Sequence, residues 1–468
     1  PKHAHGARVR FSVKYEAEGW RSCFFPFLRQ SPTPFVRIQV MTSDFSDQPR
    51  RIAFVSTRIQ GTDGVSLEIE KWADVLTRMG HQCFYIAGAS DRPADRTVVI
   101  PEAHFAHPAI QEINRQCFGR EVRHPAVGTQ IHEMAWVLKE RLRAALRQFD
   151  IDLIIAENCV TIPMNIPLGL AVVETIMESG VSCIAHHHDF VWERERFFVN
   201  AVDDHLHAAF PPPLGQVQHV AINSRAAKEF SRRTGQPCRM IPNVMDFEHP
   251  PPPPDEYSQG FRESIGLAQG DYLILQPTRI VQRKGIETSL ELIRRIDDPR
   301  CKLVITHSSG DEGHAYAERV RQYADLLGVE FILAEPWISG ERGTTPEGRK
   351  LYTIWDAYSD ADFVTYPSTY EGFGNAFLEA VYFKKPILCN LYGIYRTDIE
   401  PCGFEEILMD GFLTDEVVHQ VRRMLTDDQH RRAAVEHNYK IARQYFSYER
   451  VETELRALLA KPRLAASH

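Results

Sequence analysis

The stretch "DFVTYPSTYEGFGNAFLEAVYFKKPILCN" (residues 362–390) contains one strand–helix–strand unit. Two short apolar runs, at 362–368 and 385–390, are typical of buried strands. Between them, a glycine-bearing turn leads into a helical segment that begins at Asn375. Because parallel strands need a long crossover connection, this unit predicts a parallel sheet covered by helices.

The same alternation of strands and helices continues on both sides of this unit. In the first half, strands are predicted at 51–57, 82–88, 151–157, 182–188 and 217–224. In the second half, further strands are predicted at 272–278, 302–308 and 330–336. Helices are predicted over 65–79, 315–328, 349–361 and 430–460. The pattern predicts an α/β fold with two doubly wound domains, whose ligand sites lie at the carboxyl ends of the strands.

A run of prolines divides the chain. "EHPPPPPDEY" (248–257) cannot continue a helix or a central strand, and it behaves as a stiff spacer. Residues 1–49 have no sustained period and no signal-peptide order, so we interpret them as an extension or as upstream sequence read in error. The expected division is therefore an extension at 1–49, a first domain at 50–248, a linker at 249–258, a second domain at 259–428 and C-terminal helices at 429–468.

The composition excludes several classes of protein. At 468 residues, the chain is too long for one ordinary core. It contains no apolar run of the about 18–20 residues that a membrane span needs. The net charge of −8 argues against nucleic acid as the main partner. Nine scattered cysteines without a CxxC pair favour reduced thiols in a cytoplasmic protein, and nothing in the sequence indicates an oligomeric state.

Two glutamates flank the turn of the opening stretch. Glu371 follows a strand, and Gly372 and Gly374 let the backbone approach a ligand closely. The free N–H groups at the start of the next helix favour an anion or a hydroxyl. On a continuous helix, Glu371 and Glu379 would lie about 12 Å apart along the axis, whereas glycosidase carboxyl pairs are about 5–9.5 Å apart. Two separate acceptors for sugar or ribose hydroxyls fit this spacing better than an acid–base pair.

The segment 277–293 carries a second cluster. Arg279 ends a predicted strand, and Lys284 precedes Gly285 and the next helix. Two cations beside a helix N-terminus suit a pyrophosphate group, although an ordinary basic loop is the alternative. Arg283 is expected to face solvent.

Two further motifs lie in the first half. The turn "TRIQGTDGVS" (57–66) holds Gly61 and Gly64; it lacks GxGxxG spacing, but it can receive a phosphate or a second substrate. "HHHDF" (186–190) ends a strand. Because neighbours on a strand point to opposite faces, adjacent histidines make a poor chelate and no metal site is expected. His188 and Asp189 are expected to line a ligand site, with packing or capping as the alternative.

In this order, the motifs resemble those of the group 1, family 4 glycosyltransferases, which are retaining enzymes of the GT-B architecture. "EGFGNAFLE" (371–379) is similar to the E-x7-E motif of that family, and "RIVQRKG" (279–285) to its Arg…Lys-Gly element. The glycine loop and "HHHDF" support the resemblance, and "IPNVMDFE" (241–248) resembles the stretch before the linker without its glycine. The resemblance covers roughly residues 50–450.

This resemblance implies a fold and a reaction. The fold is two Rossmann-like domains facing a cleft, with the last helices crossing back to the first domain. The reaction moves a hexose from a nucleoside diphosphate sugar to a hydroxyl acceptor, with retention of configuration. No cofactor and no metal ion are expected, and a faint likeness to enzymes that make small soluble glycosides favours a small soluble acceptor. The donor base, the sugar and the acceptor stay open.

The resemblance also implies roles for individual residues. Arg279 and Lys284 would neutralise the diphosphate, and His188 would contact the transferred sugar. Together with Glu371, these three form the expected catalytic set. The donor-binding residues would be the cations Arg279 and Lys284, the carboxylates Glu371 (sugar) and Glu379 (ribose), and the backbone positions Gly61, Gly64, Gly372, Phe373, Gly374, Asn375 and Ala376.

Other functions fit the same architecture. A nucleotide-sugar epimerase would turn over the donor without any acceptor. A phosphorylase needs a lysine that anchors pyridoxal phosphate, and no such lysine is marked in the sequence. A sugar-nucleotide binder without catalysis would not need cations and carboxylates at strand ends in both halves.

Overall fold

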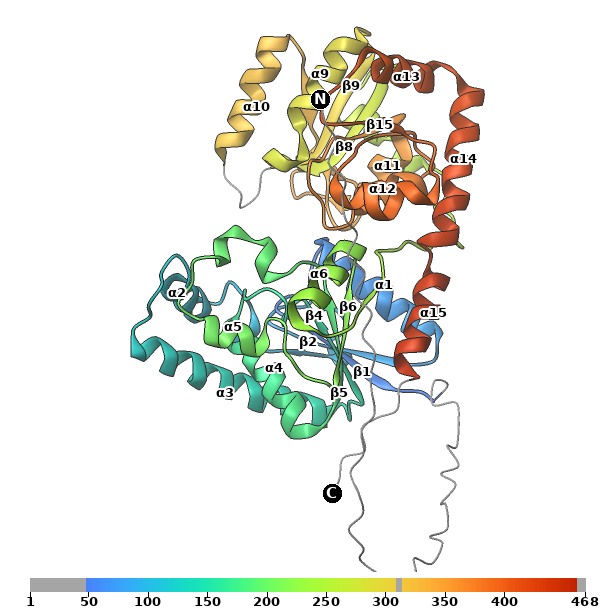
Figure 1. Ribbon diagram of the computed structural model, residues 1–468. Helices are drawn as coiled ribbons and strands as arrows, with labels where there is room; N and C mark the ends of the chain where they lie inside the picture. Colours follow the sequence, from blue (N-terminus) through green and yellow to red (C-terminus); the bar gives the residue numbers. More distant parts are fainter. Residues whose placement is uncertain (1–47, 309–313, 461–468) are drawn as a thin grey trace, which may run out of the picture. The chain divides into compact units, whose positions relative to one another are not determined.

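The computed structural model describes residues 48–308 and 314–460, and these residues form two parallel sheets with helices on both faces (Figure 1). The expected extension at 1–49 lies, except for its last two residues, outside the described residues. The predicted α/β fold class is confirmed.

The first sheet has seven parallel strands in the order β3-β2-β1-β4-β5-β6-β7. Its strands are β1 (Arg51–Ser56), β2 (Gln82–Ala87), β3 (Thr97–Val99), β4 (Leu153–Glu157), β5 (Ser182–His187), β6 (Val217–Ala221) and β7 (Cys238–Met240). The helices between them are α1 (Gly64–Arg78), α2 (Pro108–Cys117), α3 (Pro125–Gln148), α4 (Ile166–Ser179), α5 (Asp203–Ala209) and α6 (Ser224–Thr234).

Both faces of the first sheet are buried, as the near-continuous apolar strands predict. Successive residues of β1 contribute to different cores: Ile52 and Phe54 belong to one cluster, whereas Ala53 and Val55 belong to another. Side chains alternate across a strand, so a strand with a core on each face must be apolar at every position.

The second sheet has six strands in the order β10-β9-β8-β13-β14-β15. They are β8 (Tyr272–Arg279), β9 (Cys301–His307), β10 (Phe331–Leu333), β13 (Phe363–Tyr366), β14 (Ile387–Asn390) and β15 (Ile407–Met409). A separate hairpin pairs β11 (Gly343–Thr344) with β12 (Lys350–Leu351). The helices are α7 (Glu256–Gln259), α8 (Phe261–Ser264), α9 (Ile286–Ile296), α10 (His314–Leu327), α11 (Ile354–Asp360), α12 (Asn375–Tyr382) and α13 (Asp415–Thr426).

Each sheet reverses its strand order at one place. In the first sheet the chain moves from β1 outward to β2 and β3, and then returns to β4 on the other side of β1. In the second sheet the same reversal separates β8 from β13. The turns after the two strands diverge at such a point, and ligands of open α/β sheets bind in the crevice that results.

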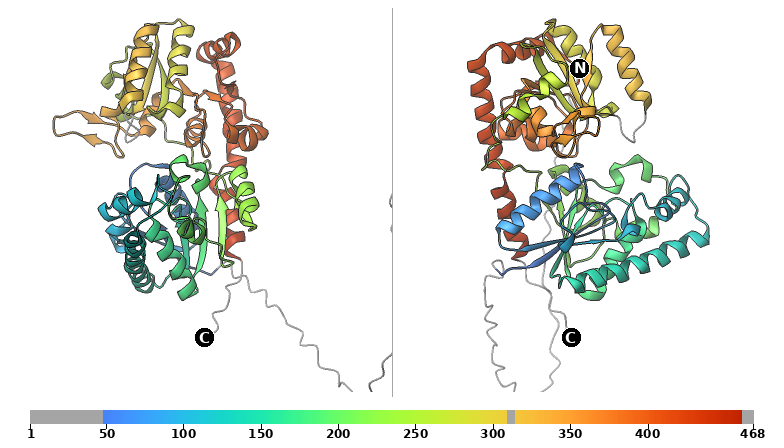
Figure 2. Two further views of the ribbon diagram at one scale, coloured as in Figure 1. Left: turned by 60° about the vertical axis from the view of Figure 1, so that its left-hand side comes forward. Right: turned by 180° about the vertical axis from the view of Figure 1, so that it is seen from behind.

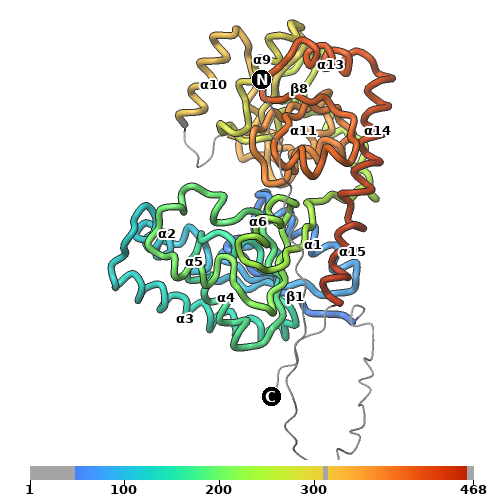
Figure 3. The backbone as a smooth tube through the Cα atoms, viewed as in Figure 1, coloured from blue at the N-terminus to red at the C-terminus, as the bar shows by residue number. Residues whose placement is uncertain are grey.

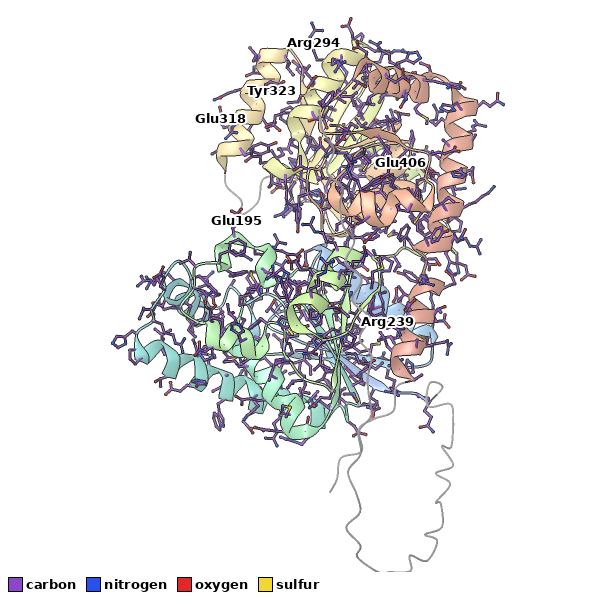
Figure 4. The ribbon with its side chains drawn as sticks, in the orientation of Figure 1. Glu195, Arg239, Arg294, Glu318, Tyr323 and Glu406 are labelled. Carbon is purple, nitrogen blue, oxygen red and sulfur yellow. The ribbon has the colours of Figure 1, made fainter. Side chains whose placement is uncertain are left out.

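The C-terminal segment predicted to be helical over 430–460 consists of two helices, α14 (Asp428–Tyr445) and α15 (Tyr448–Leu459). The break falls at Ser447, whose backbone is extended. Figure 3 traces the chain from α13 through α14 into α15, and Figure 2 shows α15 beside α1. Apolar residues of α15 join the core of the first sheet, and Arg239 on β7 forms an ion pair of 3.0 Å with Glu454 on α15 (Figure 4).

Other boundaries also differ from the sequence prediction. The helix predicted over 349–361 begins only at Ile354, because residues 350–351 pair with 343–344 in the hairpin. Three short strands at or near sheet edges, β3, β7 and β15, were not predicted, because three residues give no readable period. Helix α7 begins inside the expected linker at Glu256. The domain boundaries themselves stay a prediction.

The packing of α15 can be tested by a substitution that leaves a cavity in the core. Leu455 is wholly buried in the core of the first sheet, so Leu455→Ala is expected to lower the free energy of unfolding by about 2–5 kcal/mol. Urea unfolding followed by circular dichroism measures the change. Leu326→Ala on α10 is the matched control, because that side chain is 80% exposed and its loss is expected to cost less than about 0.5 kcal/mol. Equal effects of the two substitutions would contradict the packing of α15.

Candidate active site

The carboxyl ends of β8 and β13 lie next to each other at the reversal of the second sheet. Arg279 is the last residue of β8 and is exposed, and Lys284 lies in the turn that leads into α9. Glu371 lies in the turn between β13 and α12. Parallel topology therefore brings Glu371 to the same sheet edge as Arg279 and Lys284, and Glu371 is 87 positions from Lys284 in the sequence.

Glu371 is held by two cations. The residue is 8% exposed, and its carboxylate accepts a short hydrogen bond from Nζ of Lys284. Nη1 of Arg283 lies 3.2 Å from the other carboxylate oxygen and 3.4 Å from the backbone oxygen of Tyr370. Arg283 was expected to face solvent; its side chain is 35% exposed, but it also forms an ion pair of 3.2 Å with Glu371.

The ionisation of this group follows from burial and charge. Burial acts to raise the pKa of Glu371, but the charges of Lys284 and Arg283 outweigh it and the pKa lies below its ordinary value. Burial lowers the pKa of Lys284, and the charge of Glu371 opposes that shift. The two cations and the carboxylate thus hold one another in place.

The turn before α12 depends on glycine. Gly374 has a φ of +129°, and a methyl group there would lie 2.3 Å from the hydroxyl oxygen of Tyr392. That hydroxyl donates a 2.7 Å hydrogen bond to the backbone oxygen of Phe373, so it cannot move away without losing its acceptor. Phe373 and Ala376 are buried on either side of this close approach.

Glu379 lies one turn into α12, as expected from the sequence. Its Oε2 accepts a 2.8 Å hydrogen bond from the hydroxyl of Tyr358, a wholly buried residue of α11. Burial raises the pKa of Glu379, and the bond from Tyr358 offsets part of the rise. Tyr358 was not predicted, because a tyrosine on a helix face has the same pattern as a core residue.

Helices α9 and α12 begin without side-chain caps. Their N-cap residues are Gly285 and Gly374, neither of which can cap with a side chain, whereas Asp63 caps α1 and Asn223 caps α6. The first N–H groups of a helix have no intrahelical partner, and they bind anions well. Both uncapped helices start at the reversal of the second sheet, next to Lys284.

The glycine turn of the first sheet lies after β1. Gly61 has a φ of +75° and donates its N–H to Asp91 at 2.8 Å. Gly64 is the first residue of α1, and a methyl group there would lie 3.7 Å from Nδ2 of Asn375. The two predicted turns, one from each half of the sequence, are therefore close together.

Two of the three adjacent histidines converge on one acid. Nδ1 of His186 lies 3.0 Å from Oε2 of Glu157, the last residue of β4, and Nε2 of His188 lies 3.1 Å from the same oxygen. His187 points the other way, where Nε2 lies 2.9 Å from Nδ1 of His219. Neighbouring histidines do face opposite sides, but residues two apart share a side, and sequence reasoning missed the acid between them.

His188 also lies beside the second turn. A methyl group at Gly372 would lie 3.5 Å from the backbone oxygen of His188. Asn223, at the start of α6, donates a 2.8 Å hydrogen bond to the backbone oxygen of Gly372. The predicted residues from both halves of the chain are thus brought into one neighbourhood.

Comparison with known proteins identifies the family of this arrangement. The family model "Glycosyl transferases group 1" matches residues 348–441, which include both glutamates of the predicted motif. The mannosylglucosylglycerate synthase of Thermotoga maritima is 32% identical over 446 residues, 86% of this chain and 98% of the relative. The chain belongs to the group 1 glycosyltransferases.

Two further comparisons agree. A mannosylglucosylglycerate synthase of Petrotoga mobilis is 31% identical over 390 residues, 76% of this chain and 86% of the relative. The crystal structure of the Anabaena protein HepE in complex with UDP-glucose has a TM-score of 0.57 at 15% identity, and the match covers 88% of this chain and 99% of HepE. The predicted GT-B architecture is confirmed. No helix in the described part of this glycosyltransferase is long and apolar enough to span a membrane, and its cytoplasmic location stays a prediction.

Glu157, His186 and His188 also bear on metal binding in this glycosyltransferase. In the described ranges they are the one group of three or more histidine, cysteine or acidic side chains whose ligand atoms lie within 4.8 Å of one another. A histidine that binds a metal through one nitrogen almost always donates the other N–H to an acceptor, but Nε2 of His186 is buried without a partner. The ring of His186 stacks instead on Trp72, with centroids 4.1 Å apart. Hydrogen bonds to Glu157 account for this geometry, and the expectation of no metal ion stays a prediction.

The turn before α12 yields a prediction about stability. Gly374→Ala is expected to lower the free energy of unfolding by about 1–3 kcal/mol, because the new methyl group meets Tyr392 at an unfavourable backbone angle. Chemical unfolding measures the loss. In the control Gly215→Ala, the methyl group meets no atom within 4 Å and φ is not in the left-handed range, so no loss is expected. A variant at 374 as stable as this control would refute the close approach.

Proposed function

We propose that this glycosyltransferase moves a hexose from a nucleoside diphosphate sugar to a hydroxyl of a small soluble acceptor, with retention of configuration and without a metal ion. The observation that carries the proposal is the fixed group of Lys284, Arg283 and Glu371 beside the uncapped starts of α9 and α12. Positive charge and free N–H groups next to a hydroxyl acceptor are the partners that a sugar diphosphate needs.

The cations act on the leaving group. Breaking the bond between sugar and phosphate leaves additional negative charge on the departing diphosphate. Lys284 and Arg279, with the N–H groups at the start of α9, lie at the strand end where that charge would develop. Because Lys284 is already held by Glu371, its charge stabilises the transition state without reorganisation of solvent.

The carboxylates orient the donor. Glu371 and the backbone of the Gly372–Ala376 turn hold the hydroxyls of the transferred sugar, and Glu379 holds the ribose. Each carboxylate has a fixed partner, Lys284 for Glu371 and Tyr358 for Glu379, so each presents its remaining lone pairs in one direction. Such orientation converts binding energy into a reactive geometry.

The acceptor side is the end of the first sheet. His188 contacts the transferred sugar near the reaction centre, and the turn with Gly61 and Gly64 shapes the acceptor and phosphate side of the site. In the retaining reaction, an oxygen of the departing phosphate takes the proton of the acceptor hydroxyl on the face that the phosphate leaves. Two relatives are named for mannosylglucosylglycerate, a small glycoside, and we extend to this chain mannose as the hexose and a glucosylglycerate-like acceptor.

The first test removes the charges. Lys284→Ala and Glu371→Ala are each expected to lower kcat/KM by about 30- to 1,000-fold, which corresponds to about 2–4 kcal/mol of transition-state stabilisation. Steady-state kinetics with a sugar nucleotide and acceptor measure this loss. Lys440→Ala, which removes an exposed lysine of α14, is the control and is expected to have normal kinetics. Turnover close to normal in either site variant would refute the assignment.

The second test identifies the donor and the need for metal. Thermal unfolding is measured with UDP, GDP, ADP, CMP or no ligand, with and without EDTA. A nucleotide at 100 times its Kd adds about 2.7 kcal/mol of stability, which raises Tm by several degrees. One nucleoside diphosphate is expected to stand out, with the same shift in EDTA. No shift with any nucleotide would contradict the donor site, and a shift lost in EDTA would contradict metal independence.

The alternative enzyme on this architecture is separated by one assay. An epimerase converts its sugar nucleotide when no acceptor is present, whereas a transferase needs the acceptor for more than slow hydrolysis. Conversion that depends on added acceptor supports the proposed reaction.

A further inference from the structure

A buried acid next to His188 has no place in the reaction described so far. Glu157 ends β4, at the reversal of the first sheet, and its side chain is wholly buried. Taking an isolated carboxylate out of water costs several kcal/mol, so a buried acid needs partners that repay the cost. Both of its hydrogen-bond partners are histidines of the next strand or its end, His186 and His188.

The hydrogen bonds fix the tautomer of His188. An ionised carboxylate only accepts hydrogen bonds, so each histidine must donate an N–H to it. His188 therefore carries a proton on Nε2, and Nδ1 is the nitrogen left for another partner. Nδ1 has no hydrogen-bond partner in the ranges that the structure describes, and the side chain is 10% exposed. The backbone N–H of His188 is also fixed, by a 3.2 Å bond to Oδ1 of Asn158.

Structural need alone does not explain the second histidine. His186 is 1% exposed and stacks on Trp72, and it already gives Glu157 one buried partner. His188 gives the second, and it is the histidine that adjoins the Gly372 turn. One acid thus connects the buried core of the sheet to a residue beside the donor-binding turn.

We propose that Glu157 is a positioning residue, which holds the ring of His188 with Nδ1 directed at the reacting sugar. This inference rests on the proposed function, because it assigns a purpose to His188 in the transfer. Glu157 does not touch substrate. It acts through the orientation and tautomer of its neighbour, as a third group that orients a catalytic imidazole commonly does.

Three carboxylates act to raise the pKa of His188, and Glu157 has the largest effect among them. Burial acts to lower the pKa of His188, but the hydrogen bond and charge of Glu157 outweigh it and the pKa is raised. Glu68 on α1 and Asp189 in the following turn add smaller favourable charges. The ring of His186 lies with its centroid 4.5 Å from that of His188. Loss of the Glu157 charge is therefore expected to lower the pKa of His188.

The experiment compares two substitutions of Glu157. Glu157→Gln keeps the size of the side chain, but only its amide oxygen can accept a hydrogen bond. The NH₂ group replaces the other carboxylate oxygen and faces one of the two histidines as a second donor. Glu157→Asp keeps the carboxylate and shortens the side chain. If the carboxylate of Glu157 positions the ring of His188, kcat is expected to fall about 10- to 100-fold in the Glu157→Gln variant, with the donor KM within about threefold of wild type. The Glu157→Asp variant is expected to retain more activity than Glu157→Gln. A purely structural residue would give the reverse order, because Gln fills the same volume.

A second measurement needs no substrate. In protein labelled with ¹⁵N-histidine, the ring signals of His188 are those absent from His188→Gln, and their titration gives its pKa and tautomer. Wild type is expected to have the proton on Nε2, with a pKa above about 6.5. In Glu157→Gln the pKa falls or the tautomer changes. Asp204→Asn, which alters a carboxylate paired with Arg123 elsewhere in the first half of the chain, is the control and is expected to change neither.

The outcomes separate the two proposals. Normal kinetics in Glu157→Gln, or His188 signals that do not change in that variant, would overturn the positioning role. A metal ion bound at one equivalent in wild type and lost in Glu157→Gln would overturn it as well, because the three side chains would then be ligands. If wild type transfers no sugar with any donor, the proposed function fails, and the titration alone still decides whether Glu157 sets the state of His188.

Discussion

The direction of the strands is the constraint on which the site depends. All strands of a parallel sheet end at the same edge, so residues that follow different strands meet there without any contact in sequence. Lys284 follows β8 and Glu371 follows β13, and the two strands are neighbours only because the chain order reverses between them. The first sheet repeats the device, with Glu157 at the end of β4 and His188 after β5. The topology of the two sheets thus determines where the site of this glycosyltransferase lies.

Burial strengthens the electrostatic interactions of these side chains, but it also carries a free-energy cost of desolvation. An exposed ion pair contributes little, but a buried one must be paired well or it destabilises the fold. Each site carboxylate has such a partner: Lys284 for Glu371, Tyr358 for Glu379 and two histidines for Glu157. These partners hold each group in one orientation, which is the state a transition state needs. The uncapped helix starts at Gly285 and Gly374 have the same character, since their donors are fixed by the helix and left for a ligand.

Features that lie within one continuous motif could be predicted from the sequence, whereas contacts between residues far apart in the sequence were missed. The glycine turn before α12 and the lysine before α9 lie in continuous motifs, so spacing alone placed them. Glu157 ends an apolar strand and looks like any polar residue at the end of a strand. The pattern that could have revealed its role is an acid at the end of one strand and two histidines, two positions apart, at the end of the next strand. Arg283 was placed in solvent because only the fold brings Glu371, 88 positions away, within reach. No glycine or proline marks the break between α14 and α15, which falls at Ser447, the N-cap of α15.

In the proposed reaction the two sheets have different roles, and the charges at their carboxyl ends are consistent with this difference. The end of the second sheet is rich in fixed cations and N–H donors, which suits the group that leaves with negative charge. The end of the first sheet holds a histidine pair around one acid, which suits a neutral sugar and its hydroxyls better than a diphosphate. A donor placed with its phosphates on α9 and its sugar over the Gly372 turn therefore presents its sugar to His188, because a methyl group at Gly372 would already lie 3.5 Å from the backbone of that histidine. On this reasoning, the geometry of Glu157 matters at the sugar rather than at the nucleotide, which is why its loss should appear in kcat and leave the donor KM almost unchanged.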